Sequence, residues 1–359
     1  MPYVTVLMPV YNGEQYLEES IDSIISQTFT DFEFIIVDDG STDKTPVILN
    51  RYTDARIIKL RNPENLGMTN ALNRGLLAAQ GKFIARMDAD DISLPERLAK
   101  QVAFMENNPQ VGLCGTWIQL IDSDRSKDNI LKLPTDDATL RCELLFDSPL
   151  AHPSVMFNRK QLFANQLAYN PSYQYCQDYD LWVRCSTHFA LANIPEVLLN
   201  YRFHPKQMGR CYSESSQRLE SGPVRLVQLE HLGLSPTPKE FEIHHFIARG
   251  GYRVTPDFVQ QAHNWLVKIK LANDKTAVYS NATLGNVLAH RWLAIVNPAT
   301  TLGLFTWQLF RKSTLKNFCD LSRGQMIRLW LNCCRGQAKQ TCIQLLRLLG
   351  FFRTEAIQD

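Results

Sequence analysis

The sequence predicts an α/β fold with a mostly parallel sheet, followed by a helical C-terminal extension. Three observations lead to this prediction. Short apolar runs alternate with helical patterns through the first 110 residues, acidic residues stand where several of the apolar runs end, and strand patterns cease beyond about residue 210. Strands separated by helices of about 10–15 residues are typical of parallel sheets with right-handed crossovers and helices on both faces.

Four buried strands are predicted near the N-terminus from apolar runs bounded by turn residues. These strands cover residues 3–8, 32–37, 56–60 and 82–86. Apolar residues at helical spacing predict helices at 14–26, 43–51 and 69–79, and a further helix is expected to start near Pro95. Ligands of such sheets bind outside the carboxyl ends of the strands, so functional residues are expected there.

The pattern loosens after residue 110 and becomes helical after residue 210. We expect a strand pair within 111–120, a helix at 137–146, a strand at 152–157, a helix at 179–188 and a strand at 197–203. Helical patterns follow at 217–232, 238–249, 255–272, 281–296 and 302–350. The sequence therefore predicts an α/β domain over residues 1–208 and a helical extension over residues 209–359.

Charge is spread unevenly along the 359 residues, although the formal net charge is only +2. Residues 301–359 hold nine lysines and arginines against three acids. Such an asymmetry indicates a basic, surface-binding segment on a mildly acidic body. No stretch reaches the roughly 18 uncharged apolar residues of a spanning helix, and the chain enters a strand without a signal-peptide pattern.

Cysteine usage favours a reducing compartment. The nine cysteines are odd in number and form neither C-x-x-C pairs nor a metal-ligand spacing. We therefore expect reduced thiols and a cytoplasmic location.

Three carboxylates occur within four residues directly after the strand at 82–86, in the segment Asp88-Ala89-Asp90-Asp91. With no basic residue interleaved, they repel one another unless a cation lies between them. Mg²⁺ or Mn²⁺ takes oxygen ligands and shares them with substrate phosphates. The alternative is an acidic turn that caps the next helix, and this is the role expected for Asp91.

Three more polar segments fall where strands are expected to end: 9–14, 37–41 and, further on, 177–180. No G-x-G-x-x-G follows the first strand, and no G-x-x-x-x-G-K-[ST] occurs anywhere. These absences argue against dinucleotide-binding and P-loop folds.

Ordered motifs over residues 3–208 resemble those of family 2 glycosyltransferases, which have the GT-A fold. The segments that carry the resemblance are VTVLMPVYNGEQYLEES, FIIVDDGSTDKT, NPENLGMTNALNRG, FIARMDADDISLPERL, AHPSVMF, QDYDLWVR and NYRFHPKQMG. The resemblance implies an inverting transferase that moves a sugar from a nucleotide diphosphate sugar, expected to be a UDP-sugar, to an acceptor hydroxyl. It also implies a role in surface polysaccharide synthesis, such as capsule, exopolysaccharide or O-antigen.

The resemblance assigns a donor site to the ends of the first strands. It implies nucleotide contacts by Pro9, Val10, Tyr11 and Glu14, with Tyr11 stacked on the base. Asp39 matches the acid that accepts a hydrogen bond from uracil N3–H.

The resemblance also assigns a metal site. Asp88, Ala89 and Asp90 match the DxD-type motif, and His204 stands where relatives place a metal or diphosphate ligand. Mn²⁺ or Mg²⁺ held by Asp90, Asp88 and His204 would then neutralise the leaving diphosphate. Asn70 stands within the donor-binding segment, where many relatives carry a basic residue.

The catalytic base implied by the family motif Glu-Asp-x-Asp-Leu-Trp is Asp178. This chain reads Gln177-Asp178-Tyr179-Asp180-Leu181-Trp182, so Gln177 replaces the usual glutamate and removes one charge. A carboxylate suits the role because the attacking hydroxyl must lose a proton. Asp180 is the second candidate, although a charge stabilising the helix N-terminus is its expected role.

Two other function classes stay open at this stage. A nucleotidyltransferase shares the sheet and the metal-binding acids, and a non-catalytic sugar-nucleotide-binding protein is compatible with Gln177. The expected partners are the nucleotide sugar and a saccharide or lipid-linked saccharide acceptor, with no nucleic acid. The basic C-terminal helices are expected either to contact the inner face of the plasma membrane or to pack on protein.

Overall fold

The computed structural model describes residues 1–122, 129–204, 207, 214–250 and 254–348. The chain divides into two compact units, residues 1–226 and 227–359. The division falls within helix α9 (Glu214–His231). The sequence-based boundary after residue 208 concerns the extent of the α/β domain and stays a prediction.

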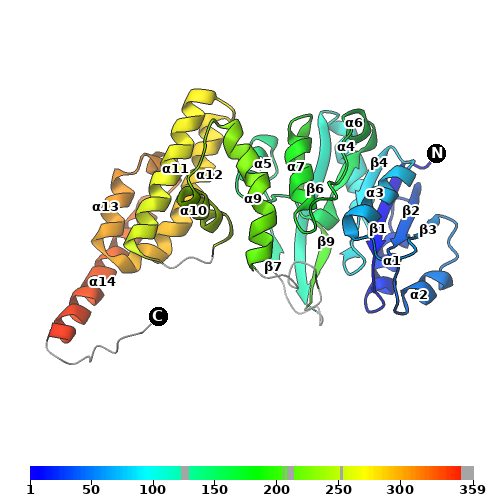
Figure 1. Ribbon diagram of the computed structural model, residues 1–359, viewed down its shortest axis with the longest axis horizontal. Helices are drawn as coiled ribbons and strands as arrows, with labels where there is room; N and C mark the ends of the chain where they lie inside the picture. The colour runs from blue at the N-terminus through cyan, green and yellow to red at the C-terminus, as the bar shows by residue number, and fades with distance from the viewer. Residues whose placement is uncertain (123–128, 205–206, 208–213, 251–253, 349–359) are drawn as a thin grey trace. The chain divides into compact units, whose positions relative to one another are not determined.

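The first unit is built on a nine-stranded sheet (Figure 1). The strands are β1 (Val4–Val10), β2 (Phe32–Asp38), β3 (Ile57–Arg61), β4 (Phe83–Arg86), β5 (Ile92–Ser93), β6 (Val111–Asp122), β7 (Asn129–Leu131), β8 (Met156–Asn158) and β9 (Ala190–Phe203). Their order is β3-β2-β1-β4-β8-β6-β9-β5, with β7 on β6. The first four strands are parallel, and β8 runs antiparallel to both β4 and β6.

Helices cover both faces of this sheet because its central strands are apolar on both sides. In β1, Val4, Val6 and Met8 belong to one hydrophobic core, whereas Leu7 belongs to the other. The helices are α1 (Leu17–Ile25), α2 (Thr45–Arg51), α3 (Met68–Ala78), α4 (Arg97–Asn107), α5 (Asp137–Glu143), α6 (Arg159–Ala164) and α7 (Gln177–Ser186). Residues of α1, α2 and α4 pack into the first core, and residues of α3, α5, α6 and α7 into the second.

The α/β fold class is confirmed, and so are the four N-terminal parallel strands. The strand pair expected within 111–120 is wrong, because β6 is one strand that pairs along its whole length with β9. The strand expected at 152–157 starts late, because Pro153 lies in a 3₁₀ turn over His152–Ser154 that precedes β8. The two-residue β5 and the six-residue α6 were not predicted, since such short elements leave no periodic pattern.

The second unit contains helices and no strand among its described residues. It comprises the end of α9, then α10 (Pro238–Arg249), α11 (Pro256–Thr276), α12 (Asn281–Ala299), η2 (Thr300–Leu302), α13 (Leu304–Lys312), η3 (Thr314–Phe318) and α14 (Arg323–Leu348). The helical pattern predicted over 302–350 is thus broken into three pieces. Within the described part of the chain, no helix combines the length and apolarity needed to cross a bilayer.

Candidate active site

Three carboxylates gather at the carboxyl end of β4. One oxygen each from Asp88, Asp90 and Asp91 lies within 4.8 Å of the other two. Asp88 and Asp90 are half-buried, and Asp91 is fully buried. Like charges at this separation repel, so the site must contain positive charge or bound protons.

Arg86 supplies part of that positive charge. Its guanidinium forms an ion pair with Asp88, although its side chain is only 2% exposed. No basic residue is interleaved among the three acids, but the last residue of β4, two positions before Asp88, provides a cation next to them. Burial raises the pKa of the Asp88 carboxyl, and the Arg86 charge opposes that rise. The Nε and Nη1 atoms of Arg86 are buried and have no hydrogen-bond partner among the described residues.

Asp91 does not cap the helix that follows, so that prediction was wrong. Helix α4 begins at Arg97, and Asp91 instead accepts a hydrogen bond from the backbone N–H of Arg202 at 2.8 Å. The hydroxyl of Ser20 donates to the Asp91 carbonyl at 2.7 Å. Burial, reinforced by the charge of Asp90, raises the pKa of Asp91 well above its usual value. Its Oδ2 atom is buried and lacks a hydrogen-bond partner in the described chain.

The end of β9 brings His204 to the acidic cluster. Strand β9 pairs antiparallel with β5, with Asn200 opposite Ile92, so the chain after residue 200 runs back toward Asp90. His204 Nε2 lies 2.9 Å from Asp90 Oδ2. Arg202 fixes this return, because its Nε donates to the Asp90 carbonyl at 2.8 Å and its Nη2 to Glu19 at 2.5 Å.

These side chains suit a hard divalent cation. The carboxylate oxygens of Asp88, Asp90 and Asp91 are of the kind that Mg²⁺ and Mn²⁺ accept, and His204 Nε2, beside Asp90, is a nitrogen donor that Mn²⁺ accepts. Asp91 has a free position for such an ion, because its buried Oδ2 has no hydrogen-bond partner among the described residues. The residues present therefore fit a metal, and Arg86 would share Asp88 with it.

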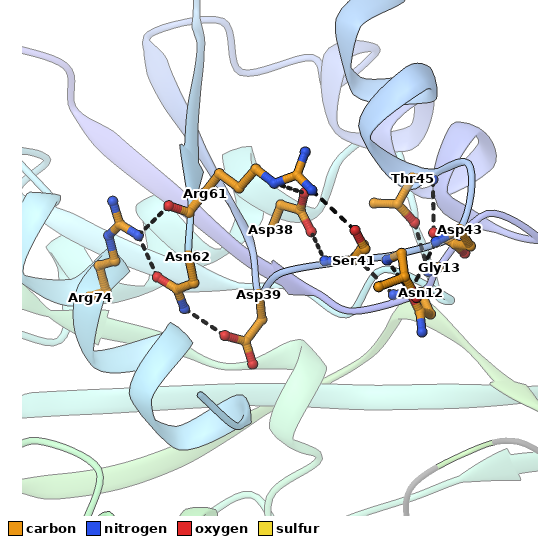
Figure 2. Close-up of polar contacts among 11 residues, drawn as sticks. Asn12, Gly13, Asp38, Asp39, Ser41, Asp43, Thr45, Arg61, Asn62 and Arg74 are labelled. Carbon is orange, nitrogen blue, oxygen red and sulfur yellow. Dashed lines mark hydrogen bonds and ion pairs between the residues drawn. The ribbon is translucent and has the colours of Figure 1, made fainter. Parts of the chain in front are cut away.

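A second cluster joins the loops after β1 and β2 (Figure 2). Asn12 has a left-handed backbone, with φ of 51°, and its side-chain oxygen accepts hydrogen bonds from the N–H groups of Thr42 and Asp43. The Asn12 N–H donates to Ser41 Oγ at 2.9 Å, and the Gly13 N–H donates to Thr45 Oγ1 at 2.9 Å. The two loops are thus held together by the chain's own groups.

Asp39, the predicted uracil acceptor, lies buried at the edge of this cluster. Its Oδ1 accepts from Asn62 Nδ2 at 2.5 Å and from the Leu66 N–H at 3.0 Å. Its Oδ2 accepts from the Gly67 N–H at 2.9 Å. A carboxylate oxygen can accept two hydrogen bonds, so Oδ2 keeps one acceptor position.

The other predicted donor-site residues lie in or beside these loops. Pro9 and Val10 end β1 and are buried, and Tyr11 is 48% exposed, as a stacking platform requires. The Glu14 carboxylate accepts from the Lys44 N–H at 3.0 Å. Asn70, exposed on α3, donates to the Leu66 carbonyl, and Ala89 is half-buried between the acids; their predicted roles stay predictions.

Asp178, the predicted base, is the second residue of α7 and is half-buried. Burial raises its pKa to about 6, and the charge of Arg86 acts against that rise. Asp180 instead forms an ion pair with Arg184 at 2.6 Å, which supports its expected structural role. Gln177 is buried, and its Nε2 lies 3.5 Å from the Met68 sulfur, which Arg86 Nη2 approaches at 4.0 Å.

His152 adds a neutral imidazole beside this region. Burial lowers its pKa well below the usual value, and the Arg86 charge lowers it further. Its Nε2 lies 2.8 Å from the Tyr169 hydroxyl. Arg86, Arg202 and Tyr169 are residues that sequence reasoning missed; a charged residue at the end of an apolar strand was the available signal for Arg86.

Comparison with known proteins identifies the family. The family model described as "Glycosyl transferase family 2" matches residues 5–166. The O-antigen biosynthesis glycosyltransferase WbnJ of Escherichia coli is 36% identical over 208 residues, which cover 56% of this chain and 80% of that protein. The chain belongs to glycosyltransferase family 2.

Solved structures agree with this glycosyltransferase fold. The crystal structure of Staphylococcus aureus TarS 1–349 in complex with UDP-GlcNAc has a TM-score of 0.55 at 17% identity, covering 86% of this chain and 92% of that one. The mannosyltransferase PcManGT from Pyrobaculum calidifontis, in complex with GDP-Man and Mn²⁺, has a TM-score of 0.50 at 20% identity, covering 89% and 88%. At these identities the likeness shows the GT-A fold alone.

Removal of the buried guanidinium should destabilise this glycosyltransferase in a pH-dependent way. We expect Arg86→Met to lower the free energy of unfolding by about 3–5 kcal/mol at pH 7, the usual cost of removing one partner of a buried ion pair. The raised pKa of Asp88 means that protonation relieves the unpaired charge, so the loss should shrink as pH falls. Urea unfolding at pH 7 and pH 5 measures both values.

Arg51→Met is the matched control. Arg51 pairs with Glu18 in solvent, with the two side chains 67% and 54% exposed, so its removal should change stability by about 0–1 kcal/mol at either pH. An Arg86→Met variant as stable as the control would contradict a charge-balancing role for Arg86.

Proposed function

We propose that this glycosyltransferase moves a sugar from a UDP-sugar to a hydroxyl of a saccharide or lipid-linked saccharide, with inversion at the anomeric carbon, in surface polysaccharide synthesis. The observation that supports the proposal most directly is that the acidic cluster and the start of α7 both lie near the guanidinium of Arg86. Arg86 pairs with Asp88. Its Nη2 lies 4.0 Å from the sulfur of Met68, which Gln177 at the start of α7 also contacts at 3.5 Å. A metal-binding group and a candidate base are thus assigned to one site.

The choice of donor rests on Asp39 and on the relatives. An acceptor oxygen of Asp39 suits the N3–H of uracil, and Tyr11 offers an exposed ring for stacking. TarS, a structural neighbour, is known in complex with UDP-GlcNAc, and WbnJ, a sequence relative, acts in O-antigen biosynthesis. Both facts support a UDP-sugar donor and a polysaccharide product.

The proposed chemistry needs a carboxylate on the side opposite the leaving group. Asp178 takes the proton of the acceptor hydroxyl as its oxygen forms a bond to the anomeric carbon. The bond from that carbon to the diphosphate oxygen breaks, and its electron pair leaves with UDP. A divalent metal, when bound by Asp90, Asp88 and His204, would neutralise the charge of the leaving diphosphate.

The non-catalytic alternative makes a different prediction. The chain with Mn²⁺, a panel of UDP-sugars and a saccharide acceptor should release UDP if it is a transferase. A chain that binds UDP-sugars and releases no UDP with any acceptor would favour a binding protein that has lost its activity.

The metal assignment predicts a selective loss of binding. Asp90→Asn keeps the shape of the side chain and removes its charge, so Mn²⁺-dependent UDP binding should fall at least tenfold, about 1.4 kcal/mol. Calorimetry with and without Mn²⁺ measures the change, with the melting temperature as a check of folding. If the UDP affinity of Asp90→Asn depends on Mn²⁺ as strongly as that of the unmodified chain, the metal assignment is wrong.

The base assignment predicts a pH effect as well as a rate effect. Because the pKa of Asp178 is about 6, turnover should rise with pH through that value and level off above it, where the carboxylate is ionised. Asp178→Asn should lower the turnover rate roughly 10²-fold or more, and its turnover should no longer rise with pH near 6, while UDP binding remains. Asp180→Asn, which removes only the partner of Arg184, is the control and should keep both.

We also propose that α14 attaches the protein to anionic membrane. Its face with Leu329 and Cys333 is buried, whereas Ile327, Trp330 and Leu331 on other faces are 42–58% exposed. Its sequence contains five lysines and arginines and no acid. Exposed apolar groups beside basic ones are typical of helices that lie in the interface of anionic bilayers.

Membrane attachment should depend on both charge and Trp330. The full chain should co-sediment with phosphatidylglycerol vesicles at low salt, bind phosphatidylcholine vesicles weakly, and detach as salt screens the charges. Trp330→Ser should weaken co-sedimentation several-fold. Leu77→Ser, at an apolar site on α3 that is 80% exposed against 43% for Trp330, should not. Absence of co-sedimentation at low salt would instead favour α14 packing on protein, such as a second copy.

A further inference from the structure

A chain of hydrogen bonds connects the surface of α3 to Asp39 (Figure 2). Arg74 donates through Nη1 to Asn62 Oδ1, and Asn62 donates through Nδ2 to Asp39 Oδ1 at 2.5 Å. Asn62 is 1% exposed and Asp39 is 2% exposed, so neither side chain can exchange this contact for water. Arg74 is exposed and is the outermost member of the series.

The chemistry of the two end groups fixes the orientation of the amide between them. A guanidinium only donates hydrogen bonds, and an ionised carboxylate only accepts them. Asn62 must therefore point its oxygen at Arg74 and its NH₂ group at Asp39. Without Arg74, the Asn62 oxygen loses its charged donor, and only the contact with Asp39 still holds the amide in place.

The orientation of Asn62 determines which oxygen of Asp39 is left for a ligand. Oδ1 already accepts from two donors, Asn62 Nδ2 and the Leu66 N–H, whereas Oδ2 accepts only from the Gly67 N–H. A carboxylate held by three donors in this way cannot rotate about its own bond without losing several of them. One acceptor position, on Oδ2, is thus held in a fixed direction.

We infer that Arg74 is a positioning residue that sets the nucleotide-base specificity of the donor site through Asn62 and Asp39. The inference rests on the proposed function, in which Asp39 receives the base. Uracil offers an N3–H donor to a fixed acceptor. Cytosine has the same ring size but an unprotonated N3, whose lone pair faces the carboxylate lone pair. A site built around a buried acceptor rejects the ligand that lacks the donor.

Arg74 also contacts the backbone. Its guanidinium is therefore held in one place by directional hydrogen bonds and does not act only as a nearby positive charge. The same Nη1 donates to the Arg61 carbonyl at 2.7 Å, which ties α3 to the end of β3. The Arg61 side chain instead contacts residues at and after the end of β2. Its Nε lies 3.6 Å from Asp38 Oδ2, and its Nη2 donates to the Ser41 carbonyl at 3.2 Å. Two neighbouring arginines thus serve two different aspartates.

The test compares UDP and CDP affinities by calorimetry in the presence of Mn²⁺. The unmodified chain should prefer UDP. Arg74→Met should weaken UDP binding about tenfold and change CDP binding little, so the preference falls. Arg74→Lys, which keeps a donor, should recover part of it. Arg61→Met, a change of the same size beside Asp38, should keep the UDP to CDP ratio.

A double-mutant cycle with Asn62→Ala tests the route of the effect. If Arg74 acts through Asn62, Arg74→Met should change the UDP to CDP ratio little when Asn62 is already alanine. An unchanged ratio in Arg74→Met, or an equal loss in Arg61→Met, would overturn the inference and leave the proposed function standing. An unmodified chain that binds neither nucleotide would overturn both.

Discussion

The repulsion among three carboxylates at the end of β4 is the constraint around which the active site is arranged. Two unit charges about 4 Å apart repel by about 4 kcal/mol at the effective dielectric of a protein surface. Asp88 is balanced by Arg86, and the Asp91 carboxylate accepts from the backbone of Arg202. Arg97, also buried, donates to the Arg86 carbonyl at 2.6 Å. The Arg86 cation thus balances Asp88, whereas burial raises the pKa of Asp91 and favours its protonated form.

This constraint explains why distant parts of the chain meet at one edge of the sheet. The acids come from the end of β4, whereas His204 and Arg202 come from the end of β9, more than a hundred residues later. Strand β8 makes the connection, since it joins the parallel strands β3-β2-β1-β4 to the β6-β9 pair. The short antiparallel contact of β5 with β9 then sets the register that places His204 on Asp90.

Local patterns in the sequence were sufficient for the strands and helices that have a regular period, and the motif segments indicated where the acids lie. They were insufficient for features that depend on pairing between distant segments. The single strand β6 was predicted as two strands because its continuity comes from β9. Asp91 was predicted to cap a helix because its contact with Arg202 lies 111 positions away. Arg86 could have been noticed, since an arginine at the end of a fully buried strand needs a partner.

The left-handed turn at Asn12 has a consequence for the thermodynamics of ligand binding. Its side chain already closes the β1 loop onto the β2 loop with the protein's own hydrogen bonds. A nucleotide that enters an ordered loop does not have to restrict the loop's backbone, and restriction of each free residue would cost about 1–2 kcal/mol of entropy. Association with such a loop can then approach the rate set by diffusion and orientation, and differences in affinity among nucleotides should arise in their rates of dissociation.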